Sequence, residues 1–247
     1  MNKKSDTSNG MDYLLSPVRR EMEERIRSGS AEYDQVLLVD FKTGDLAVNG
    51  RSMTRFDAWV DGCHEVHGRF PRFPDGQFDC VVVNLQLSWL DFGQALPEIR
   101  RILHPGGEFY FSTFGPDTLR EIHQAWSRVD ALPHVHPFTD MHHLGDMLIA
   151  SGFLKPIVDA DWWYIDFPDV DLLFHDLKHE GFTNQLSGRR KSLTGKNRFD
   201  GFRQALMQCA AGDSGYRVTF EIIYGYARNP DATDGSVRVT PPGRVAG

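Results

Sequence analysis

A polar residue ends the most apolar segment of the chain, Phe78–Asn84, and an aromatic residue follows shortly after it. Asn84 ends the segment and Trp89 lies shortly after it. A strand that is apolar at consecutive positions is typical of a parallel sheet covered on both faces. Ligands bind beyond the carboxyl ends of such strands. We therefore expect Asn84 and Trp89 to border a ligand site; the alternative is an asparagine that ends a strand and a tryptophan in the core.

Positive charges concentrate in one short segment of an otherwise acidic chain. The chain has 27 Lys and Arg against 34 Asp and Glu, a formal net charge of −7. This balance argues against a generally basic nucleic-acid binder. The five clustered cations are Arg189, Arg190, Lys191, Lys196 and Arg198. They form either a solvated surface or a patch that attracts an acidic partner protein.

Metal and disulfide chemistry have little support in the residue spacing. His64 and His67 flank Glu65-Val66, one residue short of the zinc-protease spacing H-E-x-x-H. The three cysteines are far apart, without a C-x-x-C pair. We expect no metal site, and reduced thiols in a cytoplasmic protein.

Apolar runs and breakers alternate along the chain as strands and helices do. We expect strands that begin at Val36, Phe78, Glu108, Pro156 and Val218, with a Pro105-Gly106-Gly107 turn ending the helix before Glu108. Such alternation predicts an α/β sandwich around a mostly parallel sheet. We expect one domain over residues 11–228, with disordered ends at 1–10 and 229–247, and we assign no structure to 46–76. No apolar run is long enough for a membrane helix.

Several phrases of this sequence resemble known enzymes. FPDGQFDCVVVNLQLSWL and LPEIRRILHPGGEFYFSTFGPDTLRE resemble the second half of class I S-adenosylmethionine-dependent methyltransferases. HVHPFTDMHHLGDMLIASGF, DLKHEGFTNQLSGRRKSLTGK and TFEIIYGYA are similar to the biotin-synthesis O-methyltransferase family, BioC. The resemblance covers residues 72–228.

The resemblance implies a Rossmann-like fold, S-adenosylmethionine as cofactor, and methylation of the free carboxylate of a malonyl group on acyl-carrier protein in biotin synthesis. It implies that Asn84 and Trp89 lie beside the methyl donor, that Arg189 binds the malonyl carboxylate, and that Tyr224 lines the cavity. No catalytic residue is implied, because a carboxylate is already nucleophilic and positioning suffices. The basic segment is then the surface for the acidic acyl-carrier protein.

The first half departs from the family pattern. Where the family has V-L-D-L-G-x-G-x-G, this chain reads Val36–Gly44, with Asp40 and Lys42 at the first two glycine positions. Glycines there let the backbone approach the cofactor. We expect Asp40, Thr43 and Gly44 of this loop to bind the cofactor, together with Asn84.

Residues 45–77 are also fewer than the roughly 50 that two helices and two strands need, so the first half is shortened. Asp57 or Asp61 could supply the acid that binds the ribose. Two alternatives follow. One is an inactive homologue that binds acyl-carrier protein or regulates a methyltransferase-like partner. The other is a cleft remodelled for a different ligand.

Overall fold

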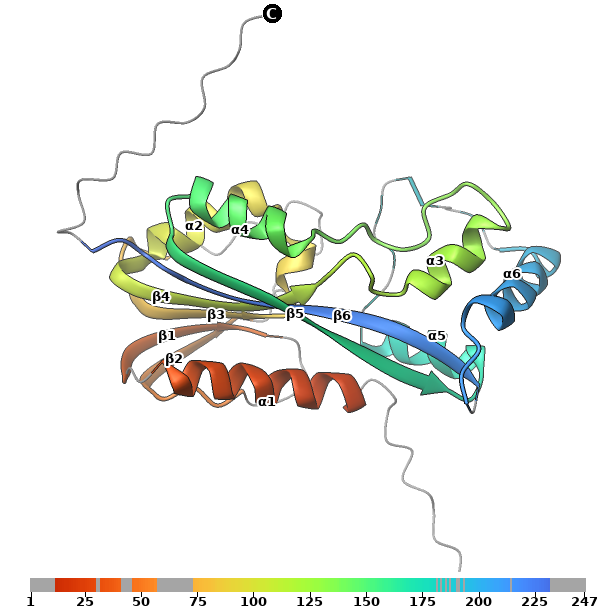
Figure 1. Cartoon of the computed structure of the whole chain (residues 1–247). Coiled ribbons are helices and arrows are strands. Elements are labelled where there is room, and N and C mark those ends of the chain that lie inside the picture. The colour runs from red at the N-terminus through yellow and green to blue at the C-terminus, as the bar shows by residue number, and fades with distance from the viewer. Residues whose placement is uncertain are drawn as a thin grey trace, which may run out of the picture. The chain divides into compact units, whose positions relative to one another are not determined.

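The computed structural model describes residues 12–29, 32–40, 46–56, 73–180, 182, 184, 186, 188–189, 192, 194–213 and 215–231. Helices and strands alternate through these residues, as Figure 1 shows. In chain order the elements are α1 (Asp12–Ser28), β1 (Tyr33–Val39), β2 (Gly50–Phe56), β3 (Phe78–Asn84), η1 (Leu87–Trp89), α2 (Phe92–Ile102), β4 (Leu103–Phe114), α3 (Arg120–Ser127), α4 (Met141–Ala150), β5 (Leu154–Phe167), α5 (Val170–His179), α6 (Lys196–Cys209) and β6 (Tyr216–Arg228). No helix among the described residues is long and apolar enough to cross a membrane.

The six strands form one sheet in the order β2-β1-β3-β4-β6-β5. β1 pairs in parallel with both β2 and β3, and β3 pairs in parallel with β4. From β1 the chain therefore continues to β2 on one side and later to β3 on the other. In α/β proteins ligands bind beyond the carboxyl ends of the strands at such a reversal, which here are the ends of β1 and β3.

The pleat sends alternate residues of the central strands to opposite faces of the sheet. One face carries Leu37, Val81 and Phe109, which join a fully apolar cluster. The same cluster contains side chains of α2, such as Ile99, and of α4, such as Leu148. Figure 1 shows these two helices on this face, so burial on both sides explains why β3 is apolar at consecutive positions from Cys80 to Val83.

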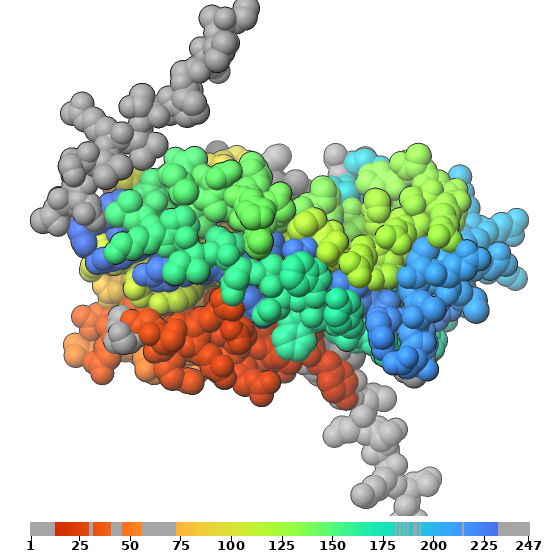
Figure 2. All heavy atoms as spheres, viewed as in Figure 1, coloured from red at the N-terminus to blue at the C-terminus, as the bar shows by residue number. Residues whose placement is uncertain are grey.

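Helix α1 lies over the opposite face, and Met22 and Ile26 are its buried side chains there. Its outer side chains are at the surface in Figure 2, where the helix is red. The chain between β1 and β2 runs beside this helix, because the Ala47 amide donates to Glu23 Oε1 at 2.8 Å. Residues 46–49 are not helical, so α1 covers a face that a crossover helix usually covers.

The chain divides into two compact units. One comprises Met1–Val18, Gly115–Phe138 and Asp161–Ile222; the other comprises Arg19–Phe114, Thr139–Ala160 and Ile223–Gly247. In the first unit α3 packs on α6 through stacked rings, with Trp126 and Phe202 centroids 4.3 Å apart. The second unit holds the apolar cluster and the carboxyl ends of β1 and β3.

The expected α/β sandwich with a mostly parallel sheet is confirmed. The five predicted strands are present, and β2 adds a sixth inside the stretch left without assignment. The helix before Pro105 ends at Ile102, as expected, but Pro105-Gly106-Gly107, expected as a turn, belong to β4. Asn229, assigned to the tail from the sequence, is buried, and its amide donates to Leu103 O at 2.9 Å.

Gly225 in β6 tests how tightly the sheet packs. A Cβ there would overlap the ring of Phe111, which is fully buried. We expect Gly225→Ala to lower the free energy of unfolding by about 1–3 kcal/mol, the usual effect of overpacking a core. Denaturant unfolding measures this difference.

Gly145 in α4 is the matched control, because a Cβ there would have no neighbour within 4 Å. Gly145→Ala should raise stability by about 0.5–1 kcal/mol through helix propensity. Equal effects of the two substitutions would contradict the packing argument.

Candidate functional site

A hydrogen-bonded chain of side chains joins three strands where they end. Asn84 Nδ2 donates to Asp40 Oδ1 at 2.8 Å, which connects the end of β3 to the residue after β1. Ser112 Oγ donates to Asn84 Oδ1 at 2.6 Å, which connects β3 to β4. All three side chains are buried, with at most 9% of any residue exposed. The Asn84 amide is therefore held in one orientation between two neighbours.

Backbone geometry at the same place is strained. Leu85, directly after Asn84, has a φ of +53°, which side-chain-bearing residues rarely adopt. Its amide donates to both the carbonyl oxygen and the Oγ of Ser112, each at 3.0 Å. Such a conformation costs roughly 1–3 kcal/mol and occurs mostly at functional sites. It turns the chain sharply at the end of β3.

The short helix η1 brings further polar groups to this turn. Ser88 Oγ and Thr113 Oγ1 share a hydrogen bond of 2.5 Å, and the Phe114 amide donates to Ser88 Oγ at 3.1 Å. Gln86 is 1% exposed, and its Nε2 has no hydrogen-bond partner among the described residues. A buried donor of this kind costs about 1–3 kcal/mol if it stays unpaired, so it favours a ligand that brings an acceptor.

The structure places Asp40 and Asn84 in hydrogen-bond contact, and Trp89 lies half-buried at the end of η1. Thr43 and Gly44 lie outside the described residues, as do Asp57 and Asp61. Tyr224 is fully buried, with the Arg25 guanidinium 4.4 Å above its ring.

The basic segment belongs to the other compact unit. Arg189 and Lys196 are exposed, while Arg190 and Lys191 lie outside the described residues. Arg198 forms an ion pair with Asp130, with Nη1 and Oδ2 3.2 Å apart. Its charge is therefore partly compensated, whereas Arg189 and Lys196 present theirs to solvent.

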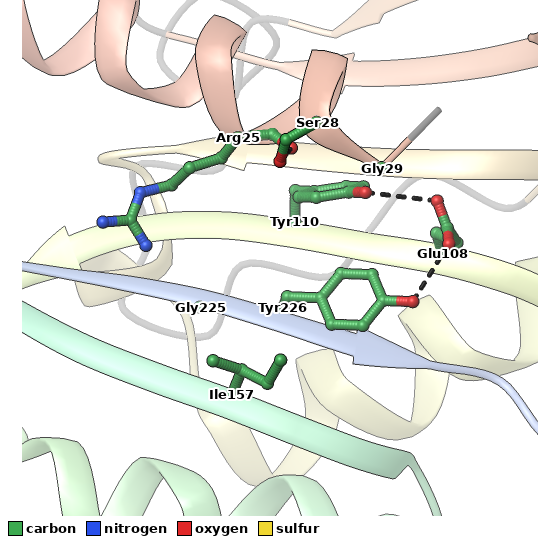
Figure 3. Close-up of a pocket in the computed structure, with 8 residues that line it drawn as sticks. All are labelled: Arg25, Ser28, Gly29, Glu108, Tyr110, Ile157, Gly225 and Tyr226. Carbon is green, nitrogen blue, oxygen red and sulfur yellow. Dashed lines mark hydrogen bonds between the residues drawn. The ribbon is translucent and has the colours of Figure 1, made fainter. Parts of the chain in front are cut away.

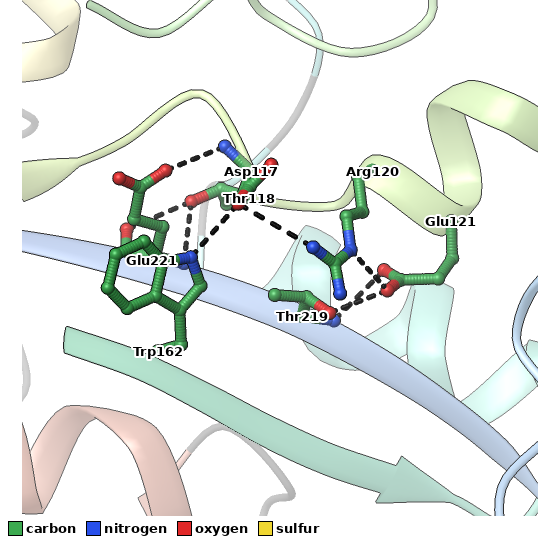
Figure 4. A network of polar contacts seen from close by, with 7 residues as sticks. All are labelled: Asp117, Thr118, Arg120, Glu121, Trp162, Thr219 and Glu221. Atoms are coloured by element: carbon green, nitrogen blue, oxygen red, sulfur yellow. Dashed lines mark hydrogen bonds and ion pairs between the residues drawn. The ribbon is translucent and has the colours of Figure 1, made fainter. Parts of the chain in front are cut away.

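A second polar network, in the unit that contains α3, holds two buried carboxylates (Figure 4). Glu121 accepts from Thr219 N at 3.0 Å and from Thr219 Oγ1 at 2.5 Å. Glu221 accepts from the Asp117 amide at 2.7 Å, and Trp162 Nε1 donates to Asp117 Oδ2 at 3.0 Å. Backbone N–H groups donate to both carboxylates. The network therefore holds α3 against β6 and has a structural role, and the candidate site is the one at the strand ends.

Sequence reasoning missed Ser112, Ser88 and Gln86 as members of the site. Ser112 and Asn84 are partners in the register of β3 and β4, so their side chains point the same way. A polar residue near the end of each of two buried strands was the available signal. Among the described residues, no group of three or more His, Cys, Asp or Glu side chains is placed to hold a metal ion.

Comparison with known proteins shows to which family this sequence is related. The profile of a methyltransferase domain family matches residues 26–111. A malonyl-[acyl-carrier protein] O-methyltransferase of Nitrosospira multiformis is 41% identical over 150 residues, which is 60% of this chain and 48% of the relative. Its counterpart from Methylovorus sp. is 34% identical over 217 residues, 82% of this chain and 71% of that protein.

Among solved structures, phosphoethanolamine N-methyltransferase 2 of Haemonchus contortus, in complex with phosphomonomethylethanolamine and S-adenosylhomocysteine, aligns with a TM-score of 0.51. The identity is 12%, over 90% of this chain and 56% of that one, so the likeness concerns the fold. The chain spans about half the length of the first curated relatives it matches, at 48%, 55% and 53%. With its α/β sheet and its match to the Methylovorus protein, the chain belongs to the malonyl-[acyl-carrier protein] O-methyltransferase family of the methyltransferases.

Proposed function

We propose that this protein is an S-adenosylmethionine-dependent O-methyltransferase that methylates the free carboxylate of malonyl-acyl-carrier protein in biotin synthesis. The observation that carries the proposal is the position of the Asp40–Asn84–Ser112 chain at the carboxyl ends of β1 and β3. In α/β sheets this is where the ligand lies. The family relationship names the ligand and the reaction.

The polar groups at this site fit the cofactor. S-adenosylmethionine carries hydroxyl and ammonium donors, for which the Asp40 carboxylate is a suitable acceptor. It also carries carboxylate and ring-nitrogen acceptors, for which the Gln86 amide is an available donor. Asn84 fixes the Asp40 carboxylate, and Trp89 offers an aromatic surface beside them. Of these, we assign Asp40, Asn84 and Gln86 to the cofactor and Trp89 to the substrate.

The protein contributes to this reaction mainly by positioning the methyl donor and the malonyl carboxylate. Bound S-adenosylmethionine supplies an activated methyl group on a sulfonium. The malonyl carboxylate is ionised at neutral pH, so no side chain has to remove a proton from it. The strained turn at Leu85 and the buried hydrogen bonds of Ser112 hold the site rigid. Rigid alignment and exclusion of water provide the acceleration.

The partner that delivers the malonyl group is an acidic carrier protein, and the exposed cations Arg189 and Lys196 suit it. Complementary charge mainly raises the rate of encounter. We assign the malonyl carboxylate to Arg189, because a guanidinium binds a carboxylate through two parallel hydrogen bonds. The described thiols, Cys80 and Cys209, are free, which suits a reducing, cytoplasmic setting.

A second candidate is an inactive homologue that binds a carrier protein or a methyltransferase-like partner. The short connection between β1 and β2 favours it, because only residues 40–49 separate the two strands and 46–49 are neither helix nor strand. Cofactor binding separates the two candidates, since the inactive homologue would bind none.

The first test is calorimetric titration with S-adenosylhomocysteine. We expect micromolar binding by the full chain, and at least tenfold weaker binding by Asn84→Ala, because a lost charge-assisted hydrogen bond is worth about 1.5–3 kcal/mol. Methyl transfer to malonyl-acyl-carrier protein should fall in parallel.

Gln124→Ala, on the exposed side of α3, is the control and should leave affinity unchanged. Absence of binding at millimolar ligand would exclude the enzyme and support the inactive homologue.

The carrier surface is tested by charge reversal. We expect Arg189→Glu combined with Lys196→Glu to slow association with malonyl-acyl-carrier protein by about tenfold or more at low salt, since steering accounts for factors of about 10–1000 in the rate. Stopped-flow kinetics over a range of ionic strength measures this. Arg27→Glu, on exposed α1, is the control. Equal rates for the two variants would reject the assigned surface.

A further inference from the structure

A cavity of about 320 Å³ lies on the α1 face of the sheet, away from the strand ends. Its walls come from the end of α1, from β4, from β6 and from Ile157 of β5 (Figure 3). Glu108 in this cavity and Ser112 at the strand end lie on the same strand, about 13 Å apart by the rise of a β-strand. The volume falls in the range of small-molecule sites, which begins at about 300 Å³.

Glu108 is surrounded by phenol groups from three strands. Tyr33 Oη donates to its Oε2 at 2.5 Å, Tyr110 Oη to the same oxygen at 3.2 Å, and Tyr226 Oη to Oε1 at 2.9 Å. Burial, together with Glu108, raises the pKa of Tyr226 to about 12 and also raises the pKa of Tyr110. The phenols therefore remain protonated at neutral pH and direct their hydrogens at the carboxylate. Their oxygen lone pairs stay available as acceptors.

Among the described residues that line the cavity, Arg25 is the one cation, and three of its five N–H donors are already used. Its Nη1 and Nη2 donate to both oxygens of Asp159 at 2.7 and 2.8 Å, and Nε donates to Glu21 at 2.8 Å. Figure 3 shows the guanidinium directed away from Glu108. These two carboxylates thus offset the positive charge of Arg25. Glu108 is a third carboxylate, so the net charge around the cavity is negative.

Aromatic and apolar surfaces complete the walls. The rings of Tyr110 and Tyr226 have centroids 5.1 Å apart, and Ile157 lines the cavity with 62% of its surface exposed. Helix α1 ends beside this cavity at Ser28, and a helix carboxyl terminus carries partial negative charge. A Cβ on Gly29 would overlap the Tyr110 hydroxyl, so the chain approaches this phenol as closely as only glycine allows.

We propose that this cavity binds a primary ammonium ion carried on a short apolar or aromatic body. The ammonium group donates to the phenol oxygens and pairs with Glu108, and the organic part lies between the tyrosine rings and Ile157. Ring faces attract such a cation in addition to the carboxylate. An anion would meet the carboxylate of Glu108 and an Arg25 whose charge two other carboxylates already oppose, so the cavity disfavours it. This site is independent of the proposed methyl transfer.

The test compares three probes of one shape in calorimetry on the full chain: phenethylammonium, 2-phenylethanol and phenylacetate. We expect phenethylammonium to bind at least tenfold more tightly than 2-phenylethanol, since a desolvated charge pair supplies about that factor, and phenylacetate not to bind. Amide chemical-shift changes at Gly225 and Tyr226 should locate the site. Glu108→Gln should remove the preference for the cation. Equal binding of ammonium and alcohol would overturn the proposal.

Because Glu108→Gln also alters a buried network, a second variant leaves that network intact. Ile157→Trp places a large ring at an exposed wall of the cavity and should weaken phenethylammonium at least tenfold. Ile149→Trp, at a 49% exposed position of α4, is the matched control and should bind normally. Unchanged affinity of Ile157→Trp would assign the bound probe to another place and reject the cavity.

Discussion

The amide of Asn84 ties together three strands that are distant in sequence, and the geometry of the candidate site depends on it. Its nitrogen donates to Asp40 beyond β1, and its oxygen accepts from Ser112 of β4. An amide is the side chain for this place because it offers a donor and an acceptor at once. With both groups occupied, it separates the ends of β1 and β4 by a fixed distance and orients the Asp40 carboxylate. Three polar side chains can be buried here because each of them is hydrogen-bonded to a neighbour.

The pleat of the sheet explains why polar chemistry gathers on one face. Val36, Cys80 and Glu108 share a face with Asn84 and Ser112, because the register pairs Val36 with Cys80, Cys80 with Glu108, and Asn84 with Ser112. The opposite face is given entirely to the apolar cluster under α2 and α4. As a result, the strand-end site and the cavity around Glu108 are two positions along the same face of β4, and helix α1 covers the second of them.

The connection between β1 and β2 is described for Asp40 and residues 46–49. Residues 40–49 return the chain to the start of β2, and a parallel connection usually takes a dozen residues or more. The described part of this connection is extended and is bonded to α1 through Ala47 and Glu23. Helix α1 thus supplies cover that a crossover helix would otherwise provide. The polar groups of β3 and β4 lie at the carboxyl ends of these two central strands.

The sequence by itself determined the α/β class and the family, since apolar runs, breakers and family phrases are local patterns. It also indicated that the first half is short. Only the tertiary structure decided that residues 50–56 form a strand, because their pattern is neither clearly apolar nor alternating and pairing with β1 supplies the hydrogen bonds. The hydrogen-bond partners of Asn84 likewise follow from the register in which β1, β3 and β4 pair, which only the tertiary structure shows. The three phenols on Glu108 come from positions 33, 110 and 226, and no spacing along a chain predicts that strands of one sheet will bring them to one carboxylate.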